Sequence, residues 1–142
     1  VIALGNMLGG LAAGVLSDRI RISTLLILQP LMSVLVLMVS VASSNAFVLL
    51  ISLVLVGFSY GSIIAVYPVA VIKIFGEKSS SQIYGRVFTA WGLAGLAGPW
   101  LAGLLYDVTG DYTLALLAAA ASSTLSVMAA YLIARQMRDN LF

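Results

Sequence analysis

The sequence predicts an all-α protein that crosses a membrane several times, and three observations carry this prediction. Hydrophobic residues make up 62% of the chain and charged residues only 8%. The mean hydropathy is +1.14, which leaves too little polar surface for a water-soluble globule. Long uncharged segments alternate with short charged ones, and a membrane-spanning helix needs roughly 20 mainly apolar residues. The chain therefore belongs to the polytopic helical class.

The uncharged segments predict five spans. The stretch 22–72 contains no charge and is too long for a single crossing. Ser43-Ser44-Asn45 places a turn near its middle, because Ser and Asn side chains form local hydrogen bonds that compete with a helix. One partial transmembrane domain over residues 1–142 is expected, with spans at about 1–17, 23–42, 46–73, 84–106 and 112–134.

The basic residues predict the orientation of these spans. When the chain is threaded through five crossings, all seven Lys and Arg residues fall on one side. The loops on the other side contain Asp107 and Asp111 and no basic residue. Cytoplasmic loops are enriched in Lys and Arg. The protein is therefore expected in the cytoplasmic (cell) membrane as a multi-pass protein, with the loops around 18–22 and 74–86 and the C-terminus in the cytoplasm.

Composition also argues against several functions. The basic residues mark topology and do not form the clustered, aromatic-interleaved surface that binds nucleic acid. The sequence has no Cys and no His, so we expect neither a metal site nor a cofactor. No nucleophile and base, and no paired carboxylates, come together in the sequence, so an enzyme is not expected. The expected partners are the lipid bilayer and a small-molecule substrate.

Small residues predict close contacts between helices. The first span contains the motif Gly5-x-x-x-Gly9 and a second one, from Gly10 to Gly14, on an adjacent face. In the fourth span Trp91 shares one face with two glycines. Small residues allow transmembrane helices to approach closely. The predicted helix-packing residues are Gly5, Gly9, Gly10, Gly92, Gly95 and Gly98.

Polar side chains within the spans predict a cavity. In the third span Ser52, Ser59 and Ser62 form one stripe, and Tyr60 and Tyr67 form a neighbouring one. Such hydroxyls either bond back to their own helix or line a wet cavity, and both alternatives stay open. Trp91 is either a membrane-interface anchor, part of the packing, or a substrate contact. The candidate cavity-lining residues are Asn6, Ser59, Tyr60, Ser62, Tyr67 and Trp91.

Two motifs resemble a known family. The sequence from Gly14 to Arg19, GVLSDR, resembles the front half of the Gly-x-Leu-x-Asp-Arg loop signature of the major facilitator superfamily. The back half differs, because Arg21-Ile22-Ser23 stands where the family has Gly and a basic pair. The stretch 84–110 resembles helix eleven of the oxalate/formate antiporter-like branch, which is related to monocarboxylate carriers.

The resemblance implies helices eight to twelve of a twelve-helix fold, with the N-terminal transmembrane half missing as a partner. It also implies alternating access. A cytoplasmic gate would be formed by Gly14, Asp18 and Arg19, with Arg86 on the same surface.

The resemblance further bears on the substrate of a secondary active transporter. In carriers of small carboxylates, the resemblance implies a cationic residue at two positions. This chain has Gly10 at the first of these positions and Trp91 at the second. Oxalate is therefore not expected as a substrate. A small organic solute is expected instead, either a monocarboxylate bound by the missing half or a neutral or apolar molecule. The alternative is a non-transporting membrane scaffold or partner subunit, derived from a split or degenerate carrier gene.

Overall fold

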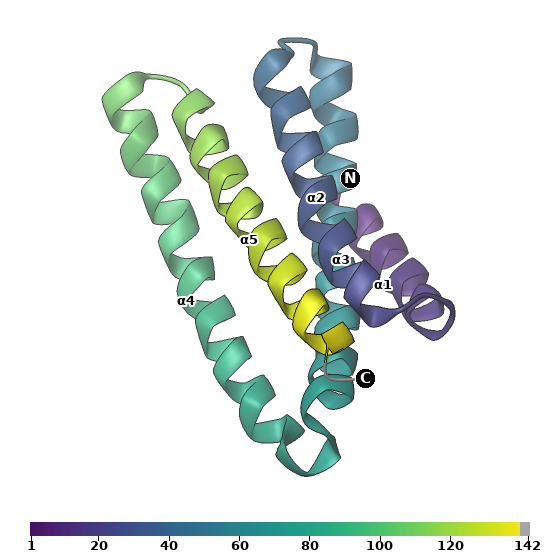
Figure 1. Ribbon diagram of the computed structural model, residues 1–142. Helices are drawn as coiled ribbons and strands as arrows, with labels where there is room; N and C mark the ends of the chain where they lie inside the picture. The colour runs from purple at the N-terminus through teal and green to yellow at the C-terminus, as the bar shows by residue number, and fades with distance from the viewer. Residues whose placement is uncertain (140–142) are drawn as a thin grey trace.

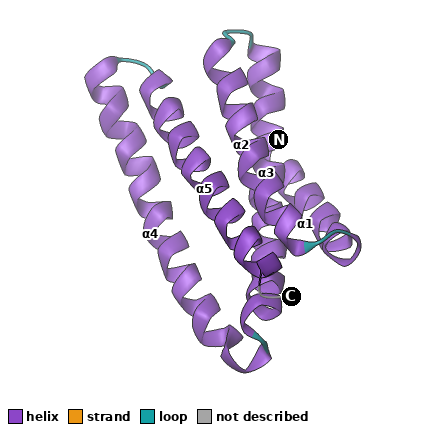
Figure 2. Cartoon of the chain, viewed as in Figure 1, coloured by secondary structure: helices purple, strands orange, loops and turns teal. Residues whose placement is uncertain are grey.

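The computed structural model describes residues 1–139 as a bundle of five α-helices (Figure 1). Short loops join consecutive helices, and no strand occurs among the described residues (Figure 2). The all-α prediction is therefore confirmed. The helices are α1 (Ile2–Arg19), α2 (Ile22–Ala42), α3 (Ala46–Phe75), α4 (Glu77–Thr109) and α5 (Thr113–Asp139).

Four of these helices, α2 to α5, are long and apolar enough to cross a membrane. The remaining helix, α1, contains Asn6 and four glycines and ends on Asp18 and Arg19. Most side chains that α4 and α5 expose are hydrophobic, including Leu96 and Leu125. Exposed leucines along helices of this length suit a lipid environment better than water.

The structure corrects the expected loop around 74–86. α3 continues to Phe75, and α4 begins at Glu77, so only Gly76 separates the two helices. Gly76 has a φ of 77°, a backbone conformation that is readily accessible to glycine and allows an abrupt turn. The polar residues that follow continue the helix instead of forming a loop. Glu77 suits the positive end of the helix dipole, and the Ser80 hydroxyl donates to the Glu77 carbonyl oxygen at 2.8 Å.

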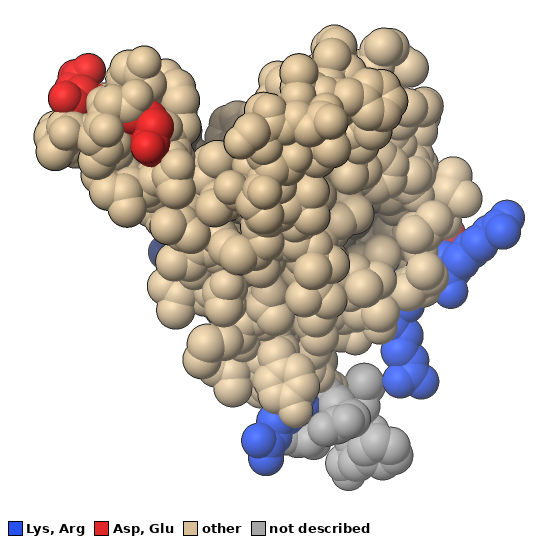
Figure 3. Space-filling view, turned by 90° about the horizontal axis from the view of Figure 1, so that it is seen from above, with Lys and Arg blue, Asp and Glu red and all other residues tan. Residues whose placement is uncertain are grey.

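The other turns lie where the sequence predicts them. Asn45 caps α3, and its side-chain oxygen accepts a hydrogen bond from the Phe47 amide at 2.9 Å. Gly110 ends α4 in the left-handed conformation. Both turns lie at one end of the bundle, at the top of Figure 1, whereas the junction between α3 and α4 lies at the opposite end. Figure 3 shows acidic side chains gathered at one corner of the molecule and most visible Lys and Arg side chains at the other edges. The C-terminal residues 140–142, which carry part of the cytoplasmic-tail prediction, lie outside the described residues.

The buried core joins four of the five helices. Val66 of α3 has no exposed surface, and it clusters with buried residues of α1, α2 and α5, among them Ala13, Leu25 and Ala130. In contrast, α4 has no buried residue. α4 therefore lies at the edge of the bundle and contacts α3 and α5.

Candidate functional site

Two glycine motifs hold α1 against α3. Gly5 and Gly9 on α1 face Val54 and Phe58 on α3, and a Cβ at either glycine would overlap a backbone oxygen of α3. The reverse also holds, because a Cβ at Gly57 or Gly61 would overlap backbone oxygens of α1. Each helix thus presents a Gly-x-x-x-Gly sequence to the other, and the two backbones touch.

Two of the predicted polar residues lie in this α1–α3 contact. Asn6 sits against Gly61, where an added Cβ would come within 2.7 Å of the Asn6 Oδ1 atom. The Ser62 hydroxyl is 2.9 Å from the Phe58 carbonyl oxygen and 3.1 Å from the Gly9 carbonyl oxygen. Its single proton is therefore shared between its own helix and α1. The Ser62 hydroxyl thus links the two helices.

An aromatic row connects α3 to α4. On α4 the ring of Phe88 lies between those of Tyr84 and Trp91, with centroid distances of 5.9 Å and 4.9 Å. The Trp91 ring is also 6.0 Å from that of Tyr60 on α3. Tyr60 and Trp91 each remain 40% exposed. Centroid separations below about 7 Å are typical of favourable aromatic pairs, so the row both joins the helices and presents ring surface.

The remaining cavity candidates of α3, Ser59 and Tyr67, are less exposed than Tyr60. Ser59 is buried, and its hydroxyl has no hydrogen-bond partner among the described residues. Tyr67 is partly buried against the hydrophobic core cluster. Tyr60 of α3 and Trp91 of α4 form an uncharged polar and aromatic surface across two helices. Asn6 of α1 lies beside Gly61, the residue that follows Tyr60 in α3.

The predicted gate residues lie at the exposed ends of their helices. Asp18 and Arg19 end α1, and Arg86 lies on the first part of α4. Among the described residues, none of these three side chains forms a hydrogen bond or an ion pair. The neighbouring residue Ser17 does accept a hydrogen bond, because the Lys73 ammonium donates to its carbonyl oxygen at 3.3 Å. Lys73 thereby ties the end of α3 to the end of α1.

The glycines of α4 and the second motif of α1 make looser contacts. A Cβ at Gly10 would meet only the Gly61 carbonyl oxygen, at 3.6 Å, and one at Gly14 would meet nothing within 4 Å. The same open space surrounds the predicted packing residues of α4, which are Gly92, Gly95 and Gly98. Among the described residues, these three glycines therefore make no close backbone contact of the kind seen between α1 and α3.

Sequence reasoning missed three contributors to this region. Phe88 lies between two aromatic residues at helical spacing, and Gly57 with Gly61 repeats the four-residue glycine spacing already evident in the first span. Both signals were present in the sequence. The stripe of serines in the third span drew the interpretation toward a cavity and away from helix contact.

Tyr60 and Trp91 offer ring faces and hydrogen-bonding groups, which can bind a solute by ring contact and hydrogen bonds. The described residues include no group of His, Cys, Asp or Glu side chains able to hold a metal ion. Comparison with known proteins then decides the family, because the sequence profile described as Major Facilitator Superfamily matches residues 1–140. The chain belongs to the major facilitator superfamily.

The chain is also similar in sequence to a curated member of the superfamily. Over 97 residues the chain is 31% identical to the uncharacterized MFS-type transporter YhjX of Escherichia coli strain K12. The aligned region covers 68% of this chain and 24% of YhjX, so the chain spans about a quarter of that relative's length. No solved structure matches the chain. Membership of this superfamily identifies a transporter family and confirms the resemblance at superfamily level.

Proposed function

We propose that the protein containing this chain is a secondary transporter that moves a small organic solute across the cytoplasmic membrane by alternating access. Family membership supports transport as the class of function. The observation that carries the proposal is the uncharged surface made by Tyr60 of α3 and Trp91 of α4, whose rings lie 6.0 Å apart and remain partly exposed. In this proposal the chain supplies helices eight to twelve, and its basic ends face the cytoplasm.

The substrate class follows from the absence of charge at this surface. An unpaired charge costs several kcal/mol in a low-dielectric site, and neither Gly10 nor Trp91 supplies the cation that a dicarboxylate would need. We therefore favour a monocarboxylate, with its counter-charge supplied by residues beyond this chain, or a neutral solute. The branch resemblance of residues 84–110 points to the monocarboxylate.

Counterflow into proteoliposomes tests this proposal. The purified protein is reconstituted, and uptake of labelled formate and lactate is compared with that of oxalate, with protein-free liposomes as the control. We expect saturable uptake of at least one monoanion and little uptake of the dianion. Faster oxalate uptake would overturn the substrate class. Absence of uptake for every solute, including a panel of neutral ones, would favour the alternative of a membrane scaffold or partner subunit.

The gate assignment leads to a separate prediction at Asp18. We expect Asp18→Asn to slow turnover about two- to fivefold, the factor that corresponds to about 0.5–1 kcal/mol for an exposed ion pair. The reason is that Asp18 would latch the cytoplasmic ends of the two halves together in one state of the cycle. The KM measured from the outside should change little. Initial rates at equal protein content give both quantities.

Asp107→Asn is the matched control for this variant, because it removes an exposed carboxylate near the opposite end of the bundle. It should leave the turnover rate unchanged. Equal rates for Asp18→Asn and the unmodified protein would remove Asp18 from the gate.

A further inference from the structure

Gln29 of α2 is an amide buried in apolar surroundings. Its side chain is 7% exposed, and neither its oxygen Oε1 nor its nitrogen Nε2 has a hydrogen-bond partner among the described residues. A buried polar group without a partner costs about 1–3 kcal/mol. Unpartnered buried groups are rare in folded proteins, so this one calls for a physical reason.

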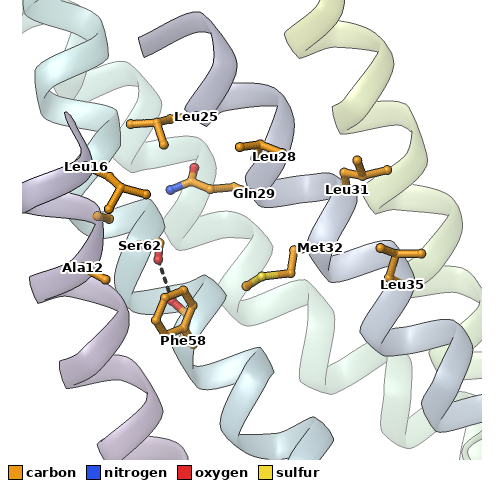
Figure 4. Close-up of a pocket in the computed structure, with 11 residues that line it drawn as sticks. Ala12, Leu16, Leu25, Leu28, Gln29, Leu31, Met32, Leu35, Phe58 and Ser62 are labelled. Atoms are coloured by element: carbon orange, nitrogen blue, oxygen red, sulfur yellow. Dashed lines mark hydrogen bonds between the residues drawn. The ribbon is translucent and has the colours of Figure 1, made fainter. Parts of the chain in front are cut away.

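Gln29 points into a cavity between α1, α2 and α3, as Figure 4 shows. The cavity has a volume of about 340 Å³ and is lined almost entirely by Ala, Leu, Met and Phe side chains. Ser62 is the other polar residue in its wall, and that hydroxyl already donates to backbone oxygens. The Gln29 amide is therefore the free hydrogen-bonding group of this cavity.

The volume and position of the cavity limit its occupant. A cavity of about 150 Å³ holds benzene, so this one accommodates a molecule roughly twice that size. Leu28, Leu31 and Leu35 line the cavity and are 41–59% exposed, which leaves a route from the bilayer. Gln29 lies seven residues into α2, or about 10 Å from its end at a rise of 1.5 Å per residue. At this depth a charged headgroup is strongly disfavoured.

We propose that this cavity binds an apolar molecule bearing one neutral group that places a hydrogen-bond donor beside an acceptor, namely a primary amide or a protonated carboxylic acid. Such a group donates to Gln29 Oε1 and accepts from Gln29 Nε2, and so satisfies both unpartnered atoms at once. The hydrocarbon body fills the space between Leu16, Leu25 and Met32. This site is distinct from the Tyr60–Trp91 surface and is reached from the lipid phase.

Photolabelling of the whole protein in phospholipid nanodiscs tests the site. The probe is a ten-carbon primary amide with a diazirine in its chain and a terminal alkyne, and mass spectrometry locates the label. We expect labelling within residues 25–35, suppressed by unlabelled decanamide. N,N-dimethyldecanamide has the same chain but no N–H, and should compete about tenfold less well, as expected for one lost hydrogen bond with its orphaned acceptor. Decanoic acid at about pH 5 should compete like decanamide.

Two variants complete the test. Gln29→Leu should abolish the preference for decanamide over its dimethyl analogue, while the protein stays folded because leucine suits the apolar wall. Ser40→Ala removes a hydroxyl from the same helix, one bonded to the Val36 carbonyl oxygen, and should keep the preference. Absence of label between residues 25 and 35, or an unchanged preference in Gln29→Leu, would overturn the proposal. The second outcome would show that acyl chains fill the cavity by apolar contact alone.

Discussion

Replacing Gly61 by alanine is expected to force α1 away from α3 and to leave little folded protein in the membrane. The added Cβ would overlap the carbonyl oxygen of Asn6 and lie within 2.7 Å of the carbonyl carbon. Because the obstacle is backbone, it cannot rotate away as a side chain could. Overpacking typically costs about 1–3 kcal/mol, and a backbone collision at the principal helix contact places Gly61→Ala at or above the top of that range.

Thermal unfolding and size-exclusion profiles of the detergent-solubilised protein measure this effect. Gly103→Ala is the matched control, because a Cβ there meets nothing within 4 Å and alanine favours a helix by about 1 kcal/mol over glycine. We expect Gly103→Ala to melt at or above the temperature of the unmodified protein. Equal stability of the Gly61 and Gly103 variants would mean that α1 and α3 do not approach as closely as their glycines indicate.

The helical fold was predictable because bilayer physics leaves few alternatives. Uncharged segments of the right length form helices in lipid. The predicted polar turn lies between α2 and α3, where Asn45 caps the start of α3. The error at 74–86 arose because hydropathy locates only the apolar part of a helix. Glu77 and the serines after it are helical outside that part, and nothing in their polarity distinguishes such an extension from a loop.

The candidate site was less predictable, because helical periodicity says which residues share a face but not what that face meets. Tyr60 and Trp91 each stood out in the sequence, yet only the fold brings their rings to 6.0 Å. The Ser62 hydroxyl bonds across the glycine contact to Gly9, a partner that helical periodicity does not identify. Gln29 belongs to no motif of the sequence, and its place in a cavity between α1, α2 and α3 depends on how the helices pack.

The second large effect is expected at Trp91. If the Tyr60–Trp91 pair lines the transport pathway, Trp91→Ala should raise the KM of the transported solute about tenfold, equivalent to about 1.4 kcal/mol of lost binding. This loss of binding free energy is smaller than the free energy gained by fully burying a large side chain. The reason is that the indole already contacts Phe88 and Tyr60 in the absence of solute. Trp91→Phe keeps an aromatic face and should recover most of the affinity. Initial uptake rates over a range of solute concentrations give the KM.

The same helix carries the control that separates substrate contact from membrane anchoring. Trp100 is 68% exposed and makes no ring contact among the described residues, so Trp100→Ala should leave the KM unchanged. An anchor or a packing residue affects how much folded protein inserts and how stably α4 holds to α3, without changing the affinity of the inserted protein. A lower melting temperature with an unchanged KM in Trp91→Ala would therefore assign Trp91 to the α3–α4 contact. A raised KM at nearly constant stability would assign it to the pathway.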